Sequence, residues 1–193
     1  MVFSLKRMSF SWADIFVYLV LTPEAVSKYS AILDFMLELR LAMVSLERDW
    51  ANENLVLRGE KKTAKSILHR VNLMRHEMIN FLSNLHAYIS CQVLEITWLE
   101  FQENLANKVT CLDNLIEVHE KFISKAVFRC LLNPKAAPVM KLLTDIFSAI
   151  AQFSSLAEVR LTSDCSAAGW ERIEQQYRVF QQYSRSALHW ELL

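Results

Sequence analysis

His119 and Glu120 are neighbouring residues whose side chains could carry acid–base chemistry. A histidine beside a carboxylate can move a proton to or from a substrate, provided that a third polar group converges on the same point. The sequence supplies no such group near the pair, and His119 falls on the apolar stripe of its predicted helix. A hydrogen-bonded core histidine therefore explains this position better than a ligand or a catalytic base, and we expect no catalytic residues.

Other residue types that hold metals or cofactors are scattered along the chain. The five histidines form no His-Glu-x-x-His motif, and the cysteines form no Cys-x-x-Cys pair. Gly59 and Gly169 are the only glycines, and each is too isolated for a phosphate-binding loop. The sequence predicts no metal, no cofactor and no enzyme. It also predicts buried thiols in a reducing compartment, at Cys91, Cys111, Cys130 and Cys165.

The composition is that of a helical domain that packs against partners. The hydrophobic fraction is 53%, and 193 residues contain only two glycines and three prolines, which leaves few turns. Basic and acidic residues both total 21, so the chain lacks the positive excess of nucleic-acid binders. We expect an all-α protein with no nucleic-acid partner, poorly soluble alone, as a piece of a larger assembly is.

The amino terminus shares some features with a signal peptide, because Lys6 and Arg7 precede an apolar run at residues 15–21. Asp14 interrupts the apolar region, however, and no small-x-small cleavage pattern follows it. The run is also shorter than the roughly 20 residues that span a bilayer. We expect a soluble intracellular chain with no membrane association.

Apolar residues spaced three or four apart predict an elongated bundle of about five to six helices, including two long ones. The first long helix begins at Thr22-Pro23-Glu24, where threonine can cap the free amide groups, and it runs to about residue 52. It is apolar on two faces, which predicts a central position in the bundle. The two stripes are Ile32, Phe35, Leu39, Met43, Leu46 and Trp50, and Tyr29, Leu33, Met36, Leu37 and Val44.

The longest helix is predicted over residues 63–100, and its stripe would extend for roughly 50 Å. Thr97 and Glu100 match a capping box, which would end this helix near Ile96 and begin another. The start of the helix is basic and is either a solvated face or a docking patch for an acidic partner. Its basic residues are Lys61, Lys62, Lys65, His69, Arg70 and Arg75. The candidate partner-binding residues among them are Lys61, Lys62, Lys65 and Arg70.

Further helices follow in the carboxy-terminal half of the chain. Thr110 and Asp113 predict a helix start, and Asn133-Pro134 ends that helix. Pro138 lies near the start of the next helix, residues 158–169 are predicted as the longest exposed loop, and the last helix begins near Trp170. We expect these core residues: Trp50, Met78, Phe81, Leu85, Ile89, Trp98, Leu115, His119 and Phe122.

The order of several motifs resembles one known family. Trp12 and residues 19–25 (Leu-Val-Leu-Thr-Pro-Glu-Ala) are similar to the opening of the carboxy-terminal domain of the gamma-tubulin complex proteins, although Ala13 replaces their usual proline. Residues 75–89 resemble the long central helix of that domain, and residues 112–120 (Leu-Asp-Asn-Leu-Ile-Glu-Val-His-Glu) resemble its next helix. Residues 125–140 are most similar to the sixth component, and the resemblance covers residues 12–184.

The resemblance implies a non-enzymatic scaffold. Domains of this family bind gamma-tubulin and, side by side in a ring complex, template microtubule nucleation at microtubule-organising centres such as the centrosome or spindle pole. It therefore implies a cytoplasmic, cytoskeletal protein whose partners are gamma-tubulin and other gamma-tubulin complex components. Residues 1–193 would form a single, incomplete carboxy-terminal domain, a fragment or short form without the amino-terminal half used for lateral contacts. A generic helical adaptor is the alternative.

Overall fold

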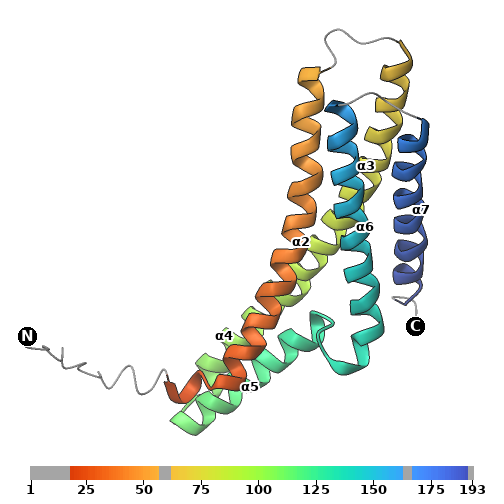
Figure 1. Ribbon diagram of the computed structural model, residues 1–193. Helices are drawn as coiled ribbons and strands as arrows, with labels where there is room; N and C mark the ends of the chain where they lie inside the picture. The colour runs from red at the N-terminus through yellow and green to blue at the C-terminus, as the bar shows by residue number, and fades with distance from the viewer. Residues whose placement is uncertain (1–17, 57–61, 163–166, 191–193) are drawn as a thin grey trace, which may run out of the picture.

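The computed structural model describes residues 18–56, 62–162 and 167–190, and the elements in this part of the chain are helical (Figure 1). No strand occurs among the described residues, and the predicted all-α class is confirmed. The α-helices are α2 (Pro23–Val56), α3 (Lys62–Tyr88), α4 (Ile96–Lys108), α5 (Leu112–Arg129), α6 (Ala137–Thr162) and α7 (Ala167–Trp190), with a π-helix, η2 (Ile89–Glu95), and a 3-10 helix, η3 (Pro134–Ala136).

Helices α2, α3, α6 and α7 run alternately up and down and form a four-helix bundle (Figure 1). Helix α6 lies against α7 and α2, while α3 lies against α2 and α7. The apolar stripes of these helices meet at the centre, as the 3.6-residue period requires. Fully buried apolar side chains of these four helices include Leu39, Leu46, Met78, Leu82, Ile146, Ile150, Phe153 and Phe180.

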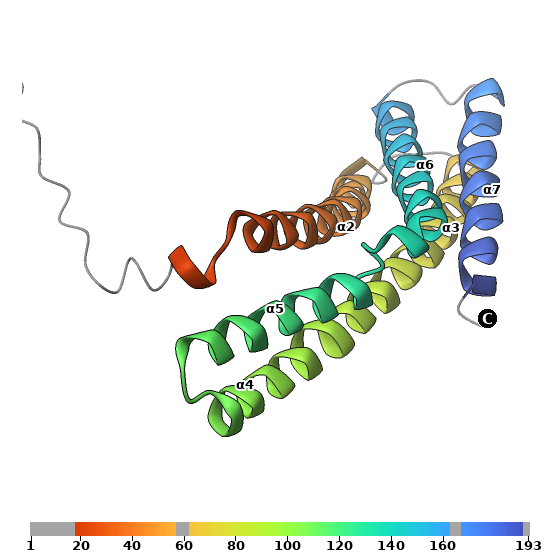
Figure 2. The same cartoon turned by 90° about the horizontal axis from the view of Figure 1, so that it is seen from below.

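Helices α4 and α5 form an antiparallel hairpin that extends beyond the bundle, beside the first turns of α2 (Figure 2). Helix α5 contacts both α2 and α4. Only Thr97 is buried in α4, and only His119, Ile123 and Ala126 are buried in α5. The hairpin therefore has a thin core and depends on the helix beside it.

The chain stays helical without a break from Lys62 to Lys108, through α3, η2 and α4. A new α-helix, α4, begins at Ile96, near the predicted boundary, but the predicted capping box at Thr97 is wrong, because Glu95 and Ile96 both have helical backbone angles and no side chain caps the start of α4. Thr97 is buried, and its hydroxyl accepts a hydrogen bond from Arg129 Nη1 at 2.8 Å. Glu100 forms ion pairs with Lys125 and Arg129. Both residues of the supposed capping box therefore fasten α4 to α5.

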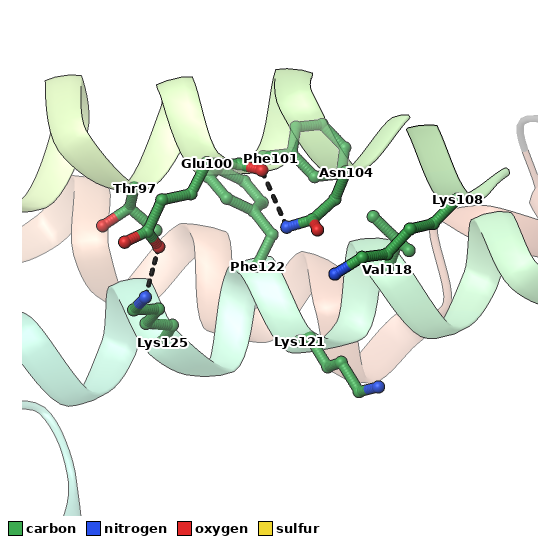
Figure 3. A pocket seen from close by; sticks show the side chains of 9 residues that line it. All are labelled: Thr97, Glu100, Phe101, Asn104, Lys108, Val118, Lys121, Phe122 and Lys125. Atoms are coloured by element: carbon green, nitrogen blue, oxygen red, sulfur yellow. Dashed lines mark hydrogen bonds and ion pairs between the residues drawn. The ribbon is translucent and has the colours of Figure 1, made fainter. Parts of the chain in front are cut away.

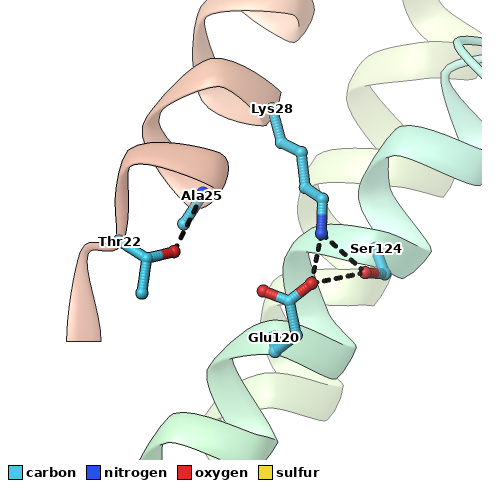
Figure 4. A network of polar contacts seen from close by, with 5 residues as sticks. All are labelled: Thr22, Ala25, Lys28, Glu120 and Ser124. Carbon is cyan, nitrogen blue, oxygen red and sulfur yellow. Dashed lines mark hydrogen bonds and ion pairs between the residues drawn. The ribbon is translucent and has the colours of Figure 1, made fainter. Parts of the chain in front are cut away.

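Helix starts follow the local sequence signals closely. The backbone N–H of Ala25 donates to Thr22 Oγ1 at 3.2 Å, which confirms the predicted cap of α2 (Figure 4). Helix α2 continues to Val56, beyond the predicted end. Helix α5 has Cys111 rather than Thr110 at its cap position, and Asp113 occupies its first turn as predicted. The Thr110 hydroxyl instead accepts from Asn114 Nδ2 at 3.1 Å.

The chain turns sharply after α5, as Asn133-Pro134 predicts. Leu131 has a positive φ of 61°, the left-handed conformation that usually closes a helix with glycine. The N–H groups of Leu131 and Leu132 donate to the carbonyls of Phe128 and Val127, both at 3.1 Å, which is the Schellman pattern. Asn133 Oδ1 then accepts from the Ala136 N–H at 2.9 Å and starts η3.

The predicted bounds of the loop at residues 158–169 are wrong. Helix α6 continues to Thr162 and α7 begins at Ala167, three residues before the predicted start at Trp170. The helical period of α6 runs on through residues 158–162, and the alanines at 167 and 168 are strong helix formers. Serine, threonine and glycine are common in loops, and their presence in this region led to the prediction of a loop that is too long.

One helical stretch, Leu112–Ala157, is long and apolar enough to cross a membrane by length and composition alone. The chain turns within this stretch at Leu131 and η3, and Ile146, Ile150 and Phe153 of α6 belong to the bundle core. The buried helices of a protein core can be as long and as apolar as a membrane span, so length and composition do not distinguish the two.

Phe153→Ala tests the bundle core. Phe153 is fully buried, so its truncation leaves a cavity and should lower the free energy of unfolding by about 3–5 kcal/mol. Urea denaturation followed by circular dichroism measures this loss. Leu73→Ala on the exposed face of α3 is the control and should change stability by less than about 0.5 kcal/mol. Equal losses in both variants would contradict the assigned core.

Candidate partner-binding surfaces

His119 of α5 lies buried against Tyr29 of α2. Tyr29 Oη and His119 Nε2 are 2.9 Å apart, and the side chain of His119 is withdrawn from water. Burial lowers the pKa of His119 from its ordinary value of 6.5, against a smaller opposing effect of Glu120. Burial also raises the pKa of Tyr29. The neutral histidine thus serves as a structural hydrogen-bonding group between two helices.

Aromatic rings continue from His119 across the hairpin to α4. The rings of Phe101 and Phe122 stack with centroids 4.5 Å apart, and Phe101 meets His119 edge-on at 6.2 Å. Trp98 packs on Phe101 and Phe122 at 5.5 and 5.9 Å. Such pairs stabilise beyond their buried area, which partly compensates for the thin core of the hairpin.

Ion pairs fasten α5 on both sides. Lys28 of α2 pairs with Glu120 and also donates to Ser124 Oγ at 3.3 Å (Figure 4). The hydrogen bond from Lys28 holds the pKa of Glu120 below its ordinary value. Because these side chains are partly exposed to solvent, the pairs orient the helices more than they stabilise them.

A pocket of about 200 Å³ lies between α4 and α5 (Figure 3). The stacked rings of Phe101 and Phe122 line it, and the pair of Lys125 with Glu100 lies at one end. His119 is not among the lining residues, and the polar groups do not converge on one point. Its residues are Thr97, Glu100, Phe101, Asn104, Lys108, Val118, Lys121, Phe122 and Lys125.

The cysteines are more exposed than the sequence predicts. Cys91 and Cys111 are exposed, which makes the expectation of buried thiols wrong for both, whereas Cys130 is buried. Burial raises the pKa of the Cys130 thiol to about 11, so it is a poor nucleophile. Cys165 lies outside the described residues. Among the residues that the structure describes, no three histidine, cysteine or acidic side chains are grouped for a metal.

The predicted basic patch at the start of α3 is only partly described. Lys61 and the side chains of Lys62 and Lys65 lie outside the described part. Arg70 contacts α7, with Nη2 at 3.3 Å from Glu174 Oε1 and its guanidinium 4.9 Å above the Trp170 ring.

Arg75 does not belong to a solvated face. It is 2% exposed and donates to Asn72 Oδ1 at 2.9 Å, which corrects its assignment to the basic patch. The apolar stripe of α3 faces the bundle on both sides of this residue, at Met74 and Met78. The sequence shows that several basic residues lie close together on this helix. It does not show whether an arginine side chain points to solvent or into the bundle.

The candidate core residues fall into three groups. Met78 and Ile89 are buried like His119, whereas Phe81, Leu85, Leu115 and Phe122 are half-buried. Trp98 is 47% exposed, so its placement in the core is corrected: its ring covers the outer edge of the hairpin aromatics. The side chain of Trp50 lies outside the described residues.

The second stripe of α2 is exposed at Tyr29, Leu33 and Leu37, although Met36 packs against the core, so α2 is not covered on both faces as its two stripes predict. Leu33 is 58% exposed and Leu37 50%, and Val26 and Leu41 lie on the same face. The first stripe does face the bundle. A pattern of apolar residues predicts two apolar faces, but it does not say whether both are covered within one chain.

This architecture defines a class of protein: an all-helical module with an uncovered apolar face on one of its helices. A family model, gamma-tubulin complex component C-terminal, matches residues 10–189, and the chain belongs to this family. Human gamma-tubulin complex component 6 is 36% identical over 143 residues, which are 71% of this chain and 8% of that protein. The resemblance to the sixth component is thereby confirmed.

More distant relatives share the same region. The spindle pole body component alp6 of Schizosaccharomyces pombe is 28% identical over 167 residues, 81% of this chain and 20% of that protein. The gamma-tubulin complex component 3 homolog of Xenopus laevis is 27% identical over 138 residues, 70% of this chain and 15% of that protein. The chain thus spans a small part of the length of these relatives.

Acid should weaken the contact between α2 and α5 through His119. Because the folded state lowers the pKa of His119, the unfolded chain binds the proton more readily, so stability is lost as the pH falls through 6.5. His119→Asn removes this dependence. Urea denaturation of both proteins between about pH 8 and pH 5 measures it. Parallel stability curves for the two proteins would contradict the prediction, since other acidic groups contribute equally to both.

Proposed function

We propose that this chain is a non-enzymatic scaffold module that binds gamma-tubulin and supports microtubule nucleation. The observation that carries the proposal is the family match over residues 10–189. The names of the relatives, gamma-tubulin complex component and spindle pole body component, support a place at microtubule-organising centres, the centrosome or the spindle pole. The partners are gamma-tubulin and other gamma-tubulin complex components, without nucleic acid or membrane.

The architecture is suited to a scaffold. The unbroken helical run from Lys62 to Lys108 is a rod that joins the bundle to the hairpin, and the aromatic rings and ion pairs keep the hairpin in place. The pocket between α4 and α5 shows no point at which a base, a nucleophile and a third group converge. A rigid surface that positions another protein requires no such pocket.

The test of this function is co-sedimentation of the purified chain with gamma-tubulin at micromolar concentrations. A complex is the expected result. Circular dichroism must show a folded helical protein, and a longer version of the chain, extended at the carboxy terminus, serves as the control for missing contacts. If neither folded protein associates with gamma-tubulin, the proposed function is contradicted.

Charge reversal tests the basic start of α3. The triple variant Lys61→Glu, Lys62→Glu, Lys65→Glu should associate with gamma-tubulin more slowly, by roughly tenfold at low salt, because it replaces attraction by repulsion. Stopped-flow measurements at several salt concentrations follow the rate. Lys135→Glu with Lys141→Glu, at exposed positions of η3 and α6, is the control for altered net charge. Equal association rates for the unmodified chain and both variants would contradict the prediction and would make these lysines part of a solvated face.

A helical adaptor is the second candidate function, and the exposed stripe of α2 is the observation that favours it. A helix face of this kind can pack on any helical protein with a matching apolar surface. Binding of the chain to a helical partner, with none to gamma-tubulin, would decide for the adaptor.

A further inference from the structure

We propose that α2 binds an amphipathic α-helix of a partner protein, which carries lysine or arginine beside its own apolar stripe. The binding surface is the α2 stripe, which we define as Val26, Leu33, Leu37 and Leu41. The proposal does not depend on gamma-tubulin; it rests on the helical adaptor, the second candidate function, and names the chemistry of the partner.

The α2 stripe is one continuous face. Its residues follow one another at steps of seven, four and four, so that they lie one above the other along about 22 Å of helix. They are 49%, 58%, 50% and 67% exposed, in chain order. The bundle is packed on the other side of α2, against buried residues such as Phe35, Leu39 and Leu46.

Single exposed leucines are normal on protein surfaces, but aligned ones are not. Four large apolar side chains on one helix face form a patch of the kind that marks an interaction site. Apolar residues at such spacing are the anchors by which one amphipathic helix packs on another. An apolar helix of about the same length would cover the whole stripe.

The charged residues beside the α2 stripe indicate which charges the partner helix carries. Asp34 and Glu38 each follow a stripe leucine by one residue, so they lie on the same border of the stripe. Both are exposed, and no ion pair joins either one to another described residue. Like charges four residues apart on a helix repel each other. Basic residues on the partner helix would relieve this repulsion and fix its register.

The opposite border carries Arg40, which is also exposed. A partner helix with basic residues on one side of its stripe and an acidic residue on the other would therefore have one preferred orientation. The acidic border also disfavours an anionic bilayer, since lipid headgroups of the same sign repel it.

The test uses the whole chain and a fluorescein-labelled helical peptide of about 18 residues, with a leucine stripe bordered by lysines. A second peptide carries glutamates in place of the lysines. Fluorescence anisotropy measures the affinity of each peptide. We expect the lysine peptide to bind at least about tenfold more tightly than the glutamate peptide.

Variants of the chain locate the binding site. Leu33→Gln, Leu37→Gln and Leu41→Gln together should weaken binding of the lysine peptide by at least about tenfold, because the anchors are removed from an exposed face that the fold does not need. Leu73→Gln with Leu99→Gln removes leucines that are as exposed on α3 and α4, and it should leave the affinity unchanged. Asp34→Lys with Glu38→Lys should reverse the preference between the two peptides.

Three results would overturn the proposal. The first is equal binding of both peptides, and the second is binding that survives the triple glutamine substitution. The third is a dimer of the chain in sedimentation velocity that the same substitution dissolves, which would make a second copy the occupant. Gamma-tubulin co-sedimentation of the unmodified chain, run beside the peptide titration, separates the two proposals, since the scaffold function can fail while the peptide still binds.

Discussion

The contacts of one helix hold the two parts of this protein together. Helix α2 packs against α3 and α6 in the bundle and against α5 in the hairpin. Phe35 and Leu39 lie within the core, with the Phe35 ring 6.3 Å from Phe147, while Lys28 and Tyr29 reach α5 from the same helix. Because the hairpin has few buried side chains of its own, its position depends on this continuous helix.

The other two connections between bundle and hairpin are irregular. The π-helix η2 joins α3 to α4, and the Schellman turn at Leu131 with η3 joins α5 to α6. The two connections meet, since η2 contacts α5 and the buried Ile89 and Cys130 share one core cluster. A π-turn widens the helix and shifts the faces that follow it, so this junction sets the direction in which α4 leaves the bundle.

Local signals in the sequence predicted most of the fold. A cap or a turn depends on contacts between residues that are neighbours in the sequence, so the sequence alone reveals it. Thr22 caps α2 and Asn133-Pro134 ends the α5 segment through contacts within one turn of the chain. Thr97 and Glu100 carry an equally good local signal, but Arg129 and Lys125, some thirty residues away, bind both side chains. Tertiary partners therefore decided whether this helix continued, and no neighbour in sequence could reveal them.

The same limit explains why the surfaces were harder to predict than the core. The spacing of apolar residues predicted two apolar faces on α2. Phe35 and Leu33 both fit that spacing, yet Phe35 is 3% exposed and Leu33 is 58% exposed. The difference arises because α3, α5 and α6 all contact α2, and its buried residues, such as Phe35 and Leu39, lie on one side of the helix. A chain that is 53% hydrophobic, folded into a slender bundle and a hairpin, has more apolar surface than its own helices can cover. In the helix docking that we propose, this excess is the means of assembly, since the uncovered face of α2 is removed from water only when another helix packs against it.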